Sequence, residues 1–368
     1  MDYEPLPREV EAGHVVLLDD GNIMLRVRDT DGRDIRCEVE RGGVLTSHKG
    51  INVPGAPLSA PAISDKDLAD VQFGVENGVN MFALSFVRQA SDITDLRPHA
   101  GSAGLIAKIE RPEALADIDA ILASADGVMV ARGDLGVEIP LEEVPDAQRR
   151  LLLAANRAGK PSITATQMLE SMVENARPTR AEATDVHVAV TQLTDAVMLS
   201  AETAIGAYPV ETVRYMARIA AAAETSAEFR GHVRAQSDIA RDSTEAVAQA
   251  ACEMASELNA KAIVCSTSSG STARMVAKYR PSVPIVALAH DSRVRHRLSL
   301  TWGVTPLASP PFRSTDEMIG VASQLVVEAG FASPGDLVVI TAGVPLGTPG
   351  HTNLIKVHRL GDPVTSGI

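Results

Sequence analysis

Five apolar runs, each ending in polar or small residues, recur through the middle of the sequence and constrain its fold more than any other feature. They begin at Met81, Gly104, Gly127, Pro161 and Ala196, so their starts lie 23, 23, 34 and 35 residues apart. Helical patterns such as "PEALADIDAILASA" occupy the stretches between them. Continuous apolar strands that alternate with helices are typical of a parallel sheet covered by helices. The middle of the chain is therefore predicted to be a βα repeat, either in a barrel or in an open α/β sheet.

The regions on either side of this repeat have different patterns of apolar and polar residues. Up to about Gly55, "HVVLLDDGNIMLRVRD" places two apolar runs around Asp-Asp-Gly-Asn, which predicts a hairpin in a small β-rich unit. After about Arg230, a long helix pattern leads into "AIVCSTSSGSTARMVAKY", "PIVALA", "GVTPLA" and "DLVVITAG". This last section is predicted to be a compact α/β domain. The segment before it, "RIAAAAETSAEFRGHVRAQSD", is helical at first and then polar, and it is predicted to be a hinge.

Charge and cysteine content exclude several functional classes. Lys and Arg total 34 against 47 for Asp and Glu, which gives a net charge of −13, so neither a nucleic-acid surface nor an anionic membrane surface is predicted. Cys37, Cys252 and Cys265 show no CxxC or metal-ligand spacing, and their odd number disfavours a disulfide framework. A reducing, cytoplasmic location is expected.

Chemically competent side chains gather where the predicted strands end. "AKIER" places Lys108 and Glu110 two residues apart on one strand face, and "VMVARGDLGVEIP" places Arg132 and Asp134 just after the next strand. The carboxyl ends of parallel strands form the catalytic rim of barrels and of open α/β sheets. Two carboxylates from neighbouring strands suit Mg²⁺, which keeps waters and substrate oxygens as its other ligands. A purely structural Lys108–Glu110 ion pair fits the sequence equally well.

Four further motifs allow both a functional and a structural interpretation. Thr164 and Thr166 end the strand in "SITATQMLESM", where hydroxyl groups could bind phosphate but more commonly cap a helix. "NARPTRAEATDV" carries two arginines and has Pro178 at the start of another helix, and its structural interpretation is a polar loop. Ser200 and Glu202 fall at the carboxyl end of the last strand of the repeat. The turn in "STSSGSTARMVAKY" could cradle a phosphate, although Ser/Gly turns are common.

Taken in order, "AKIER", "VMVARGDLGVEIP", "ITATQMLESM", "RPTRAEATDV" and "VMLSAETAIGAYPVETV" resemble the pyruvate kinase family. The resemblance extends from "DYEPLP" near the start, through "SHKGINVPG", to "GVPLGTPGHTNLIKV" near the end. It implies an α/β fold with a (β/α)8 TIM barrel, a mobile β-rich lid and a C-terminal three-layer α/β effector domain. It also implies phosphoryl transfer from phosphoenolpyruvate to ADP, giving pyruvate and ATP.

The same resemblance implies roles for individual residues. Glu110 and Asp134 would bind Mg²⁺, and Lys108 would stabilise the transferring phosphoryl group and the enolate. Thr166 would help to position substrate and deliver a proton. The resemblance further implies substrate contacts from Gly133 and Asp134 through their amides, with Arg132 holding the loop, and a nucleotide contact from Lys49. The effector-phosphate loop would be formed by Thr267, Ser268, Ser269, Gly270, Ser271 and Thr272.

The resemblance also implies which parts of the family pattern this sequence lacks. The family has three barrel strands before its lid, whereas this sequence begins in lid-like residues, so an N-terminally incomplete chain is expected. The expected domains are a partial lid at 1–57, five barrel strands at 58–228 and the effector domain at 229–368. The arginine that grips the substrate phosphate and the K⁺ ligands would lie on the absent strands, so activity of this chain alone is left open. Smaller departures from the family are His187, Ala201 and Ile205.

Partners and alternative functions follow from the same considerations. The resemblance implies a homotetramer, and a sugar phosphate or AMP would be the effector. Two alternatives to phosphoryl transfer stay open: Mg²⁺-dependent enolate chemistry, as in an oxaloacetate decarboxylase-like lyase, and a non-catalytic metabolite-binding subunit.

Overall fold

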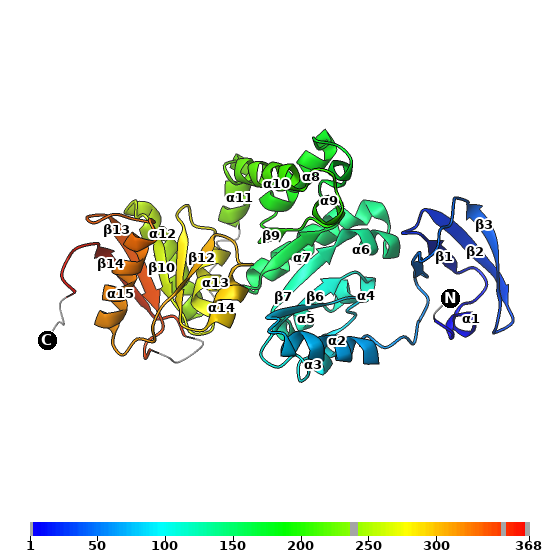
Figure 1. The fold of residues 1–368 in the computed structure, drawn as a ribbon, viewed down its shortest axis with the longest axis horizontal. Coiled ribbons are helices and arrows are strands. Elements are labelled where there is room, and N and C mark those ends of the chain that lie inside the picture. The colour runs from blue at the N-terminus through cyan, green and yellow to red at the C-terminus, as the bar shows by residue number, and fades with distance from the viewer. Residues whose placement is uncertain (1–2, 236–241, 347–350, 365–368) are drawn as a thin grey trace.

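The computed structural model describes residues 3–235, 242–346 and 351–364, which form three sheets that follow one another along the chain (Figure 1). An antiparallel sheet comes first, a parallel sheet with its helices lies in the middle, and a mixed α/β domain comes last (Figure 1). Among the described residues, no helix is both long enough and apolar enough to cross a membrane.

The first sheet has four antiparallel strands in the order β3-β2-β1-β4. The predicted hairpin is confirmed, because β1 (Val15–Leu18) pairs with β2 (Ile23–Thr30) across a turn in which Asp19, Asp20 and Gly21 have positive φ. β3 (Ile35–Arg41) and β4 (Ile51–Asn52) complete the sheet, which is preceded by α1 (Leu6–Glu9). The sheet and α1 share a small apolar core that includes Leu6, Val10, Val16, Val27 and Val53.

The middle sheet confirms the predicted parallel βα repeat. It runs in chain order, with every neighbouring pair parallel, through β5 (Met81–Leu84), β6 (Gly104–Ile109), β7 (Gly127–Ala131), β8 (Ser162–Ala165) and β9 (Ala196–Val197). All five residues of β7 are buried, as expected for a strand covered on both faces. The last strand is shorter than the apolar run "AVMLSAET" indicates, because the chain leaves the sheet and enters a helix directly after Ser200.

Helices connect these strands and cover the sheet (Figure 1). They begin with α2, whose N-cap Ser64 and Asp67 form a capping box. The helices are α2 (Asp65–Glu76), α3 (Ala90–Leu96), α4 (Pro112–Ala116), α5 (Ile118–Ser124), α6 (Arg132–Glu138), η1 (Leu141–Glu143), α7 (Val144–Arg157), η2 (Glu170–Val173), α8 (Arg180–Thr191), α9 (Ala201–Ala204), α10 (Pro209–Glu224) and α11 (Ala227–Ala235). The boundary expected at 228/229 falls within α11. The segment predicted to be a hinge belongs mostly to α10 and α11, and its last residues lie outside the described ones.

The last domain has the three layers expected from the sequence. Its sheet has the order β12-β11-β10-β13-β14, and only β14 is antiparallel to its neighbour. One apolar core packs the sheet against α12, α13 and α14, and another packs the opposite face against α15. The elements are α12 (Ser243–Glu257), β10 (Ile263–Ser266), α13 (Ser271–Lys278), β11 (Ile285–Ala289), α14 (Ser292–Leu298), β12 (Val304–Ala308), α15 (Thr315–Glu328), β13 (Leu337–Ala342) and β14 (Leu354–Arg359).

Candidate active site

A lysine and a buried glutamate meet at the carboxyl end of β6. Lys108 belongs to the strand, and Glu110 follows its last residue. The Lys108 ammonium lies 2.6 Å from Glu110 Oε1 and donates a hydrogen bond of 2.7 Å to Ser85 Oγ, just past the end of β5. Glu110 Oε2 accepts the Phe86 amide at 2.6 Å. The ends of two neighbouring strands therefore hold one acid and one base side by side.

The Glu110 carboxyl group is in an environment that disfavours its charge. Its side chain is fully buried, and burial raises its pKa, although Lys108 and the Phe86 amide act in the opposite direction. The nearby carboxylate of Asp134 raises the pKa of Glu110 further. Asp134 lies in the first turn of α6, which begins directly after β7. Two acids from neighbouring strands thus repel each other at this rim.

A divalent cation fits this pair of acids. It would offset the repulsion between the Glu110 and Asp134 carboxylates, and Mg²⁺ often takes only one or two carboxylates from a protein. Within the described part of the chain, no group of three or more His, Cys, Asp or Glu side chains could form a fuller protein cage. The donor set therefore suits a metal that also keeps waters or substrate oxygens as ligands.

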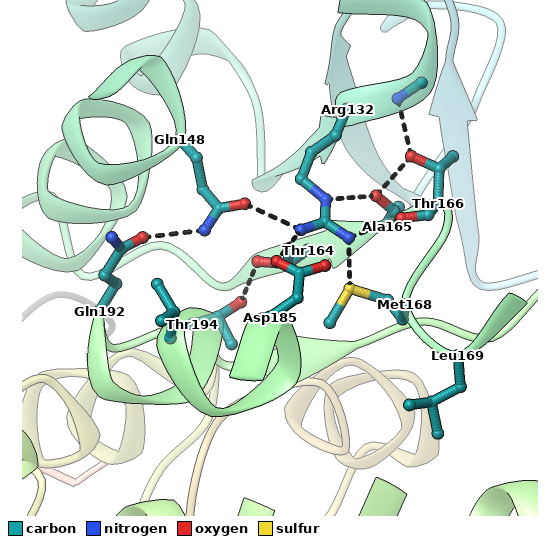
Figure 2. A network of polar contacts seen from close by, with 12 residues as sticks. Arg132, Gln148, Thr164, Ala165, Thr166, Met168, Leu169, Asp185, Gln192 and Thr194 are labelled. Atoms are coloured by element: carbon teal, nitrogen blue, oxygen red, sulfur yellow. Dashed lines mark hydrogen bonds and ion pairs between the residues drawn. The ribbon is translucent and has the colours of Figure 1, made fainter. Parts of the chain in front are cut away.

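Arg132 fixes the loop that follows β8 (Figure 2). Its guanidinium donates to the carbonyl oxygens of Ala165 at 3.2 Å and Thr166 at 2.6 Å, and it pairs with Asp185 of α8. Gln148 and Met168 Sδ are further acceptors, at 3.5 and 2.8 Å. The Arg132 side chain therefore connects the start of α6 to the loop after β8 and to α8.

The loop held by Arg132 has a strained backbone at Thr166. Thr166 has φ of +68° and Gln167 has φ of +53°, and a left-handed conformation is unusual for a β-branched residue. Such strain costs about 1–3 kcal/mol and collects at functional sites. Thr166 Oγ1 accepts the Gly133 amide at 2.8 Å and donates to the Ala165 carbonyl at 2.6 Å. Thr166 and Gly133, two of the residues with expected substrate contacts, are thus hydrogen-bonded to each other in this structure.

Replacing Asp185 with asparagine tests the support given by Arg132. Asparagine keeps the shape of the side chain but removes the charge that partners the guanidinium, so we expect the free energy of unfolding to fall by about 1 kcal/mol. Chemical denaturation would measure the change. The matched control is Asp146→Asn, which breaks an exposed pair with Arg149 and should change stability very little. Equal losses in the two variants would contradict the role assigned to the Arg132–Asp185 pair.

A cavity of about 740 Å³ opens between the first sheet and the strand ends. Ser85, Phe86 and Asp134 line it from the parallel sheet, and Gly50 and Asn52 line it from the antiparallel sheet. Asn52 also donates to Glu138 Oε1 at 3.1 Å, and Arg111 contacts the same oxygen at 3.1 Å. These contacts tie the antiparallel sheet to the rim that carries the acid pair.

Lys49 does not join the Lys108–Glu110 cluster. Its ammonium lies 2.6 Å from Asp19 Oδ1, and its side chain is about two-fifths exposed. Its neighbour Gly50 does line the cavity between the two sheets. Lys49 is therefore paired with Asp19 and is next in sequence to a residue that lines the cavity.

The expected effector loop forms one wall of a separate pocket of about 110 Å³ in the last domain. Gly270 has φ of +85° and is the N-cap residue directly before α13, and its amide donates to Thr267 Oγ1 at 2.9 Å. The other loop residues line this pocket: Thr267, Ser268, Ser269, Ser271 and Thr272. His290 and His351 also line it.

Sequence reasoning missed Ser85 and Asp185. Ser85 contacts Lys108 from the end of the preceding strand, a position that "MFALSFV" could have flagged as a polar strand end. Asp185 occurs in the quoted motif "RPTRAEATDV", but its partner Arg132 lies 53 residues earlier. No spacing signal connects two residues so far apart.

Comparison with known proteins identifies the family. A sequence model of the domain described as "Pyruvate kinase, barrel domain" matches residues 1–213, and that described as "Pyruvate kinase, alpha/beta domain" matches residues 245–358. Proteins named pyruvate kinase from Geobacillus stearothermophilus and Bacillus licheniformis are 48% and 47% identical over 99% of the chain. The chain spans 64% of the length of these two relatives.

A third relative is matched over more of its own length. The pyruvate kinase of Clostridium acetobutylicum is 41% identical over 97% of this chain and 77% of that protein. Both domain matches follow the order of the sheets seen here, with the barrel match over the first two and the α/β match over the last. The chain belongs to the pyruvate kinase family.

Proposed function

We propose that the chain transfers the phosphoryl group of phosphoenolpyruvate to ADP, giving pyruvate and ATP in glycolysis. The observation that carries the proposal is the Lys108 ammonium held 2.6 Å from buried Glu110, at the rim where Asp134 also lies. Phosphoryl transfer needs positioned cations around a spreading negative charge, without a covalent intermediate on the protein. A lysine beside two potential metal ligands meets that need.

Each residue of the site would have a distinct task. Glu110 and Asp134 would hold Mg²⁺, which supplies positive charge to the phosphoryl oxygens when it is bound. The Lys108 ammonium would stabilise charge on the transferring group and on the enolate oxygen. The Thr166 hydroxyl would exchange its bond with the Gly133 amide for a bond to substrate or to a water that protonates the enolate carbon.

The remaining assignments belong to the same proposal. Gly133 and Asp134 would bind the substrate carboxylate through their amides, with Arg132 holding the loop, and Lys49 would leave Asp19 to meet the nucleotide phosphates. Thr267–Thr272 would bind the phosphate of a sugar-phosphate or AMP effector. K⁺ as a second cofactor, a homotetramer, a cytoplasmic location and domains at 1–57, 58–228 and 229–368 are further parts of the proposal.

A coupled assay tests the activity. Pyruvate formed from phosphoenolpyruvate and ADP would be followed through NADH oxidation by lactate dehydrogenase, with Mg²⁺ and K⁺ present. We expect a rate that requires ADP and Mg²⁺. Folded protein that gives no NADH oxidation above background would overturn the proposal. Pyruvate release from oxaloacetate without ADP would instead favour the lyase.

Mg²⁺ is expected to raise the thermal unfolding midpoint more at about pH 8 than at about pH 5, because Mg²⁺ and protons compete for Glu110. Burial raises the pKa of Glu110 above its ordinary value of 4.5. Between the ordinary pKa and the raised one, the folded chain binds more protons than the unfolded chain, so without Mg²⁺ this group's contribution to stability falls as pH rises. Differential scanning calorimetry would measure both trends.

The control for this prediction is Glu110→Gln, which cannot titrate. In that variant the difference in Mg²⁺ stabilisation between the two pH values should shrink. An undiminished difference would mean that other groups bind the metal.

A further inference from the structure

A third cavity, of about 230 Å³, lies between the parallel sheet and the last domain. On the sheet side, Met81 begins β5, Asp126 directly precedes β7, and Lys160 precedes β8. These are the amino ends of the parallel strands, the opposite edge from the Lys108 rim. α13 and α14 of the last domain face this edge (Figure 1) and contribute Arg274 and Arg297.

The charges in this cavity are unbalanced. Three cations, Lys160, Arg274 and Arg297, line it together with a single carboxylate, Asp126. That carboxylate is already engaged, because its Oδ2 pairs with Arg97 and accepts the Leu105 amide at 2.8 Å. Such an excess of positive charge is unusual in a chain with a net charge of −13.

The three cations have few bonding partners. Lys160 Nζ donates to the Ala125 carbonyl at 2.8 Å, and Arg274 Nη1 donates to the Ser269 carbonyl at 3.3 Å. The half-buried Arg297 guanidinium makes no hydrogen bond or ion pair with any residue in the described ranges. Its stem crosses the start of β6, where a Cβ at Gly104 would lie 3.2 Å from Arg297 Cδ. The arginine thus passes close to the strand without using its donors.

Arg280, at the same interface, is a buried cation whose donors do have partners in the protein. Arg280 donates to Asp195 Oδ1 at 2.9 Å and to the carbonyls of Leu193 and Ala277 at 2.6 and 3.2 Å. Its side chain is 1% exposed. Arg274 is also deeply placed but has one long hydrogen bond to a carbonyl and no ion pair among the described residues. The protein therefore gives the Arg280 donors a carboxylate and two carbonyl groups, whereas it gives the Arg274 donors a single carbonyl group.

Repulsion between the cations also indicates that their charges are poorly compensated. Burial lowers the pKa of Lys160, the charge of Asp126 raises it, and the charges of Arg274 and Arg97 lower it. Burial likewise lowers the pKa of Arg274, the charge of Asp126 raises it, and the charge of Arg297 lowers it. The cations are therefore close enough to disfavour one another in a poorly solvated place. A bound anion would relieve both effects.

We propose that this cavity is a binding site for a phosphate group, either inorganic phosphate or a small phosphate monoester. Arginine guanidinium groups offer paired donors that match phosphate oxygens, and lysine adds a point charge. The volume is below the roughly 300–1,000 Å³ of pockets for larger organic ligands. The occupant would therefore be little larger than phosphate itself. Its site would lie at the strand edge opposite the Lys108 rim and beside the pocket in front of Thr267–Thr272, because Ser269 lines both cavities.

Titration calorimetry on the full chain tests the proposal, with inorganic phosphate in one arm and glycerol 3-phosphate in the other, at constant ionic strength. We expect saturable binding of at least one of them below about 10 mM. Tighter binding of glycerol 3-phosphate identifies a monoester as the ligand, and equal or weaker binding identifies inorganic phosphate.

Arg297→Gln is the decisive variant, because this guanidinium has no described partner to lose and the fold should be retained. It should weaken binding by about tenfold or more, since charge-assisted bonds are lost. The control is Arg293→Gln on the same helix, which removes an exposed cation paired with Asp291 and should bind as the unmodified chain does. Arg274→Gln gives a second measurement from α13. The proposal is overturned if neither ligand saturates, or if Arg297→Gln and Arg274→Gln bind as tightly as the control.

Discussion

Replacing Lys108 with methionine is expected to lower kcat for pyruvate formation by about two to three orders of magnitude, as loss of a preorganised charge-stabilising group does in other enzymes. The Lys108 ammonium lies 2.6 Å from Glu110 and 2.7 Å from Ser85, so it is fixed at the rim before any substrate arrives. Its charge would meet negative charge that grows during transfer. The loss should therefore appear in kcat more than in KM. The lactate dehydrogenase-coupled assay would measure both constants.

Two further variants separate chemistry from folding. Methionine leaves Glu110 buried without its cation, so the thermal midpoint of Lys108→Met must be measured beside its rate. Lys108→Arg keeps the charge and should retain the fold, while losing activity because the longer fork cannot occupy the same place. Lys66→Met removes an exposed lysine paired with Asp70 and should leave kcat unchanged. A folded Lys108→Met enzyme with kcat within a few fold of the unmodified chain would contradict the role assigned to Lys108.

Local signals in the sequence were sufficient to predict most of the fold. The apolar runs from Met81, Gly104, Gly127 and Pro161 gave rise to strands, because each is long enough to be buried on both faces and ends in residues that stop it. The run from Ala196 was a weaker guide, since its apolar character continues past the two residues that pair in β9. Periodicity shows what can be buried, but it does not show where hydrogen bonding to the neighbour ends.

The candidate site was predictable only where its residues are close in sequence. Lys108 and Glu110 are two residues apart at a strand end, so their meeting followed from strand geometry. The left-handed conformation of Thr166 could not be foreseen, because β-branched residues disfavour it locally and a distant arginine holds the loop. Ser85 joins the site from another strand. Such contacts depend on tertiary packing rather than on spacing.

The contacts between the parallel sheet and the last domain could likewise not be predicted from the sequence. Asp195 and Arg280 are 85 residues apart, and neither belongs to a recognisable motif. In the structure Asp195 also accepts the amides of Ser162 and Trp302, at 3.0 and 3.1 Å. One carboxylate thus joins the start of β8 to two segments of the last domain.

Arg280→Met is expected to lower the free energy of unfolding by about 3–5 kcal/mol, the range for breaking a buried ion pair by removing one partner. The Arg280 and Asp195 side chains are 1% and 6% exposed, so water cannot replace the lost guanidinium at the carboxylate. The carbonyl of Leu193 also loses its donor, and Trp302 loses a cation 5.1 Å from its ring centre. Denaturant unfolding would measure the change through the fluorescence of Trp302, the single tryptophan of the chain.

The cause of this loss can be separated from the loss of packing. Arg280→Met combined with Asp195→Asn removes the stranded charge, so the double variant should be more stable than the sum of the two single losses predicts. Arg149→Met, which breaks an exposed pair with Asp146, should cost no more than about 1 kcal/mol. If Arg280→Met cost no more than Arg149→Met, the Arg280–Asp195 pair could not be what joins the last domain to the parallel sheet. A large loss that Asp195→Asn partly restores would show that the stranded carboxylate, and not the missing side-chain volume, destabilises the interface.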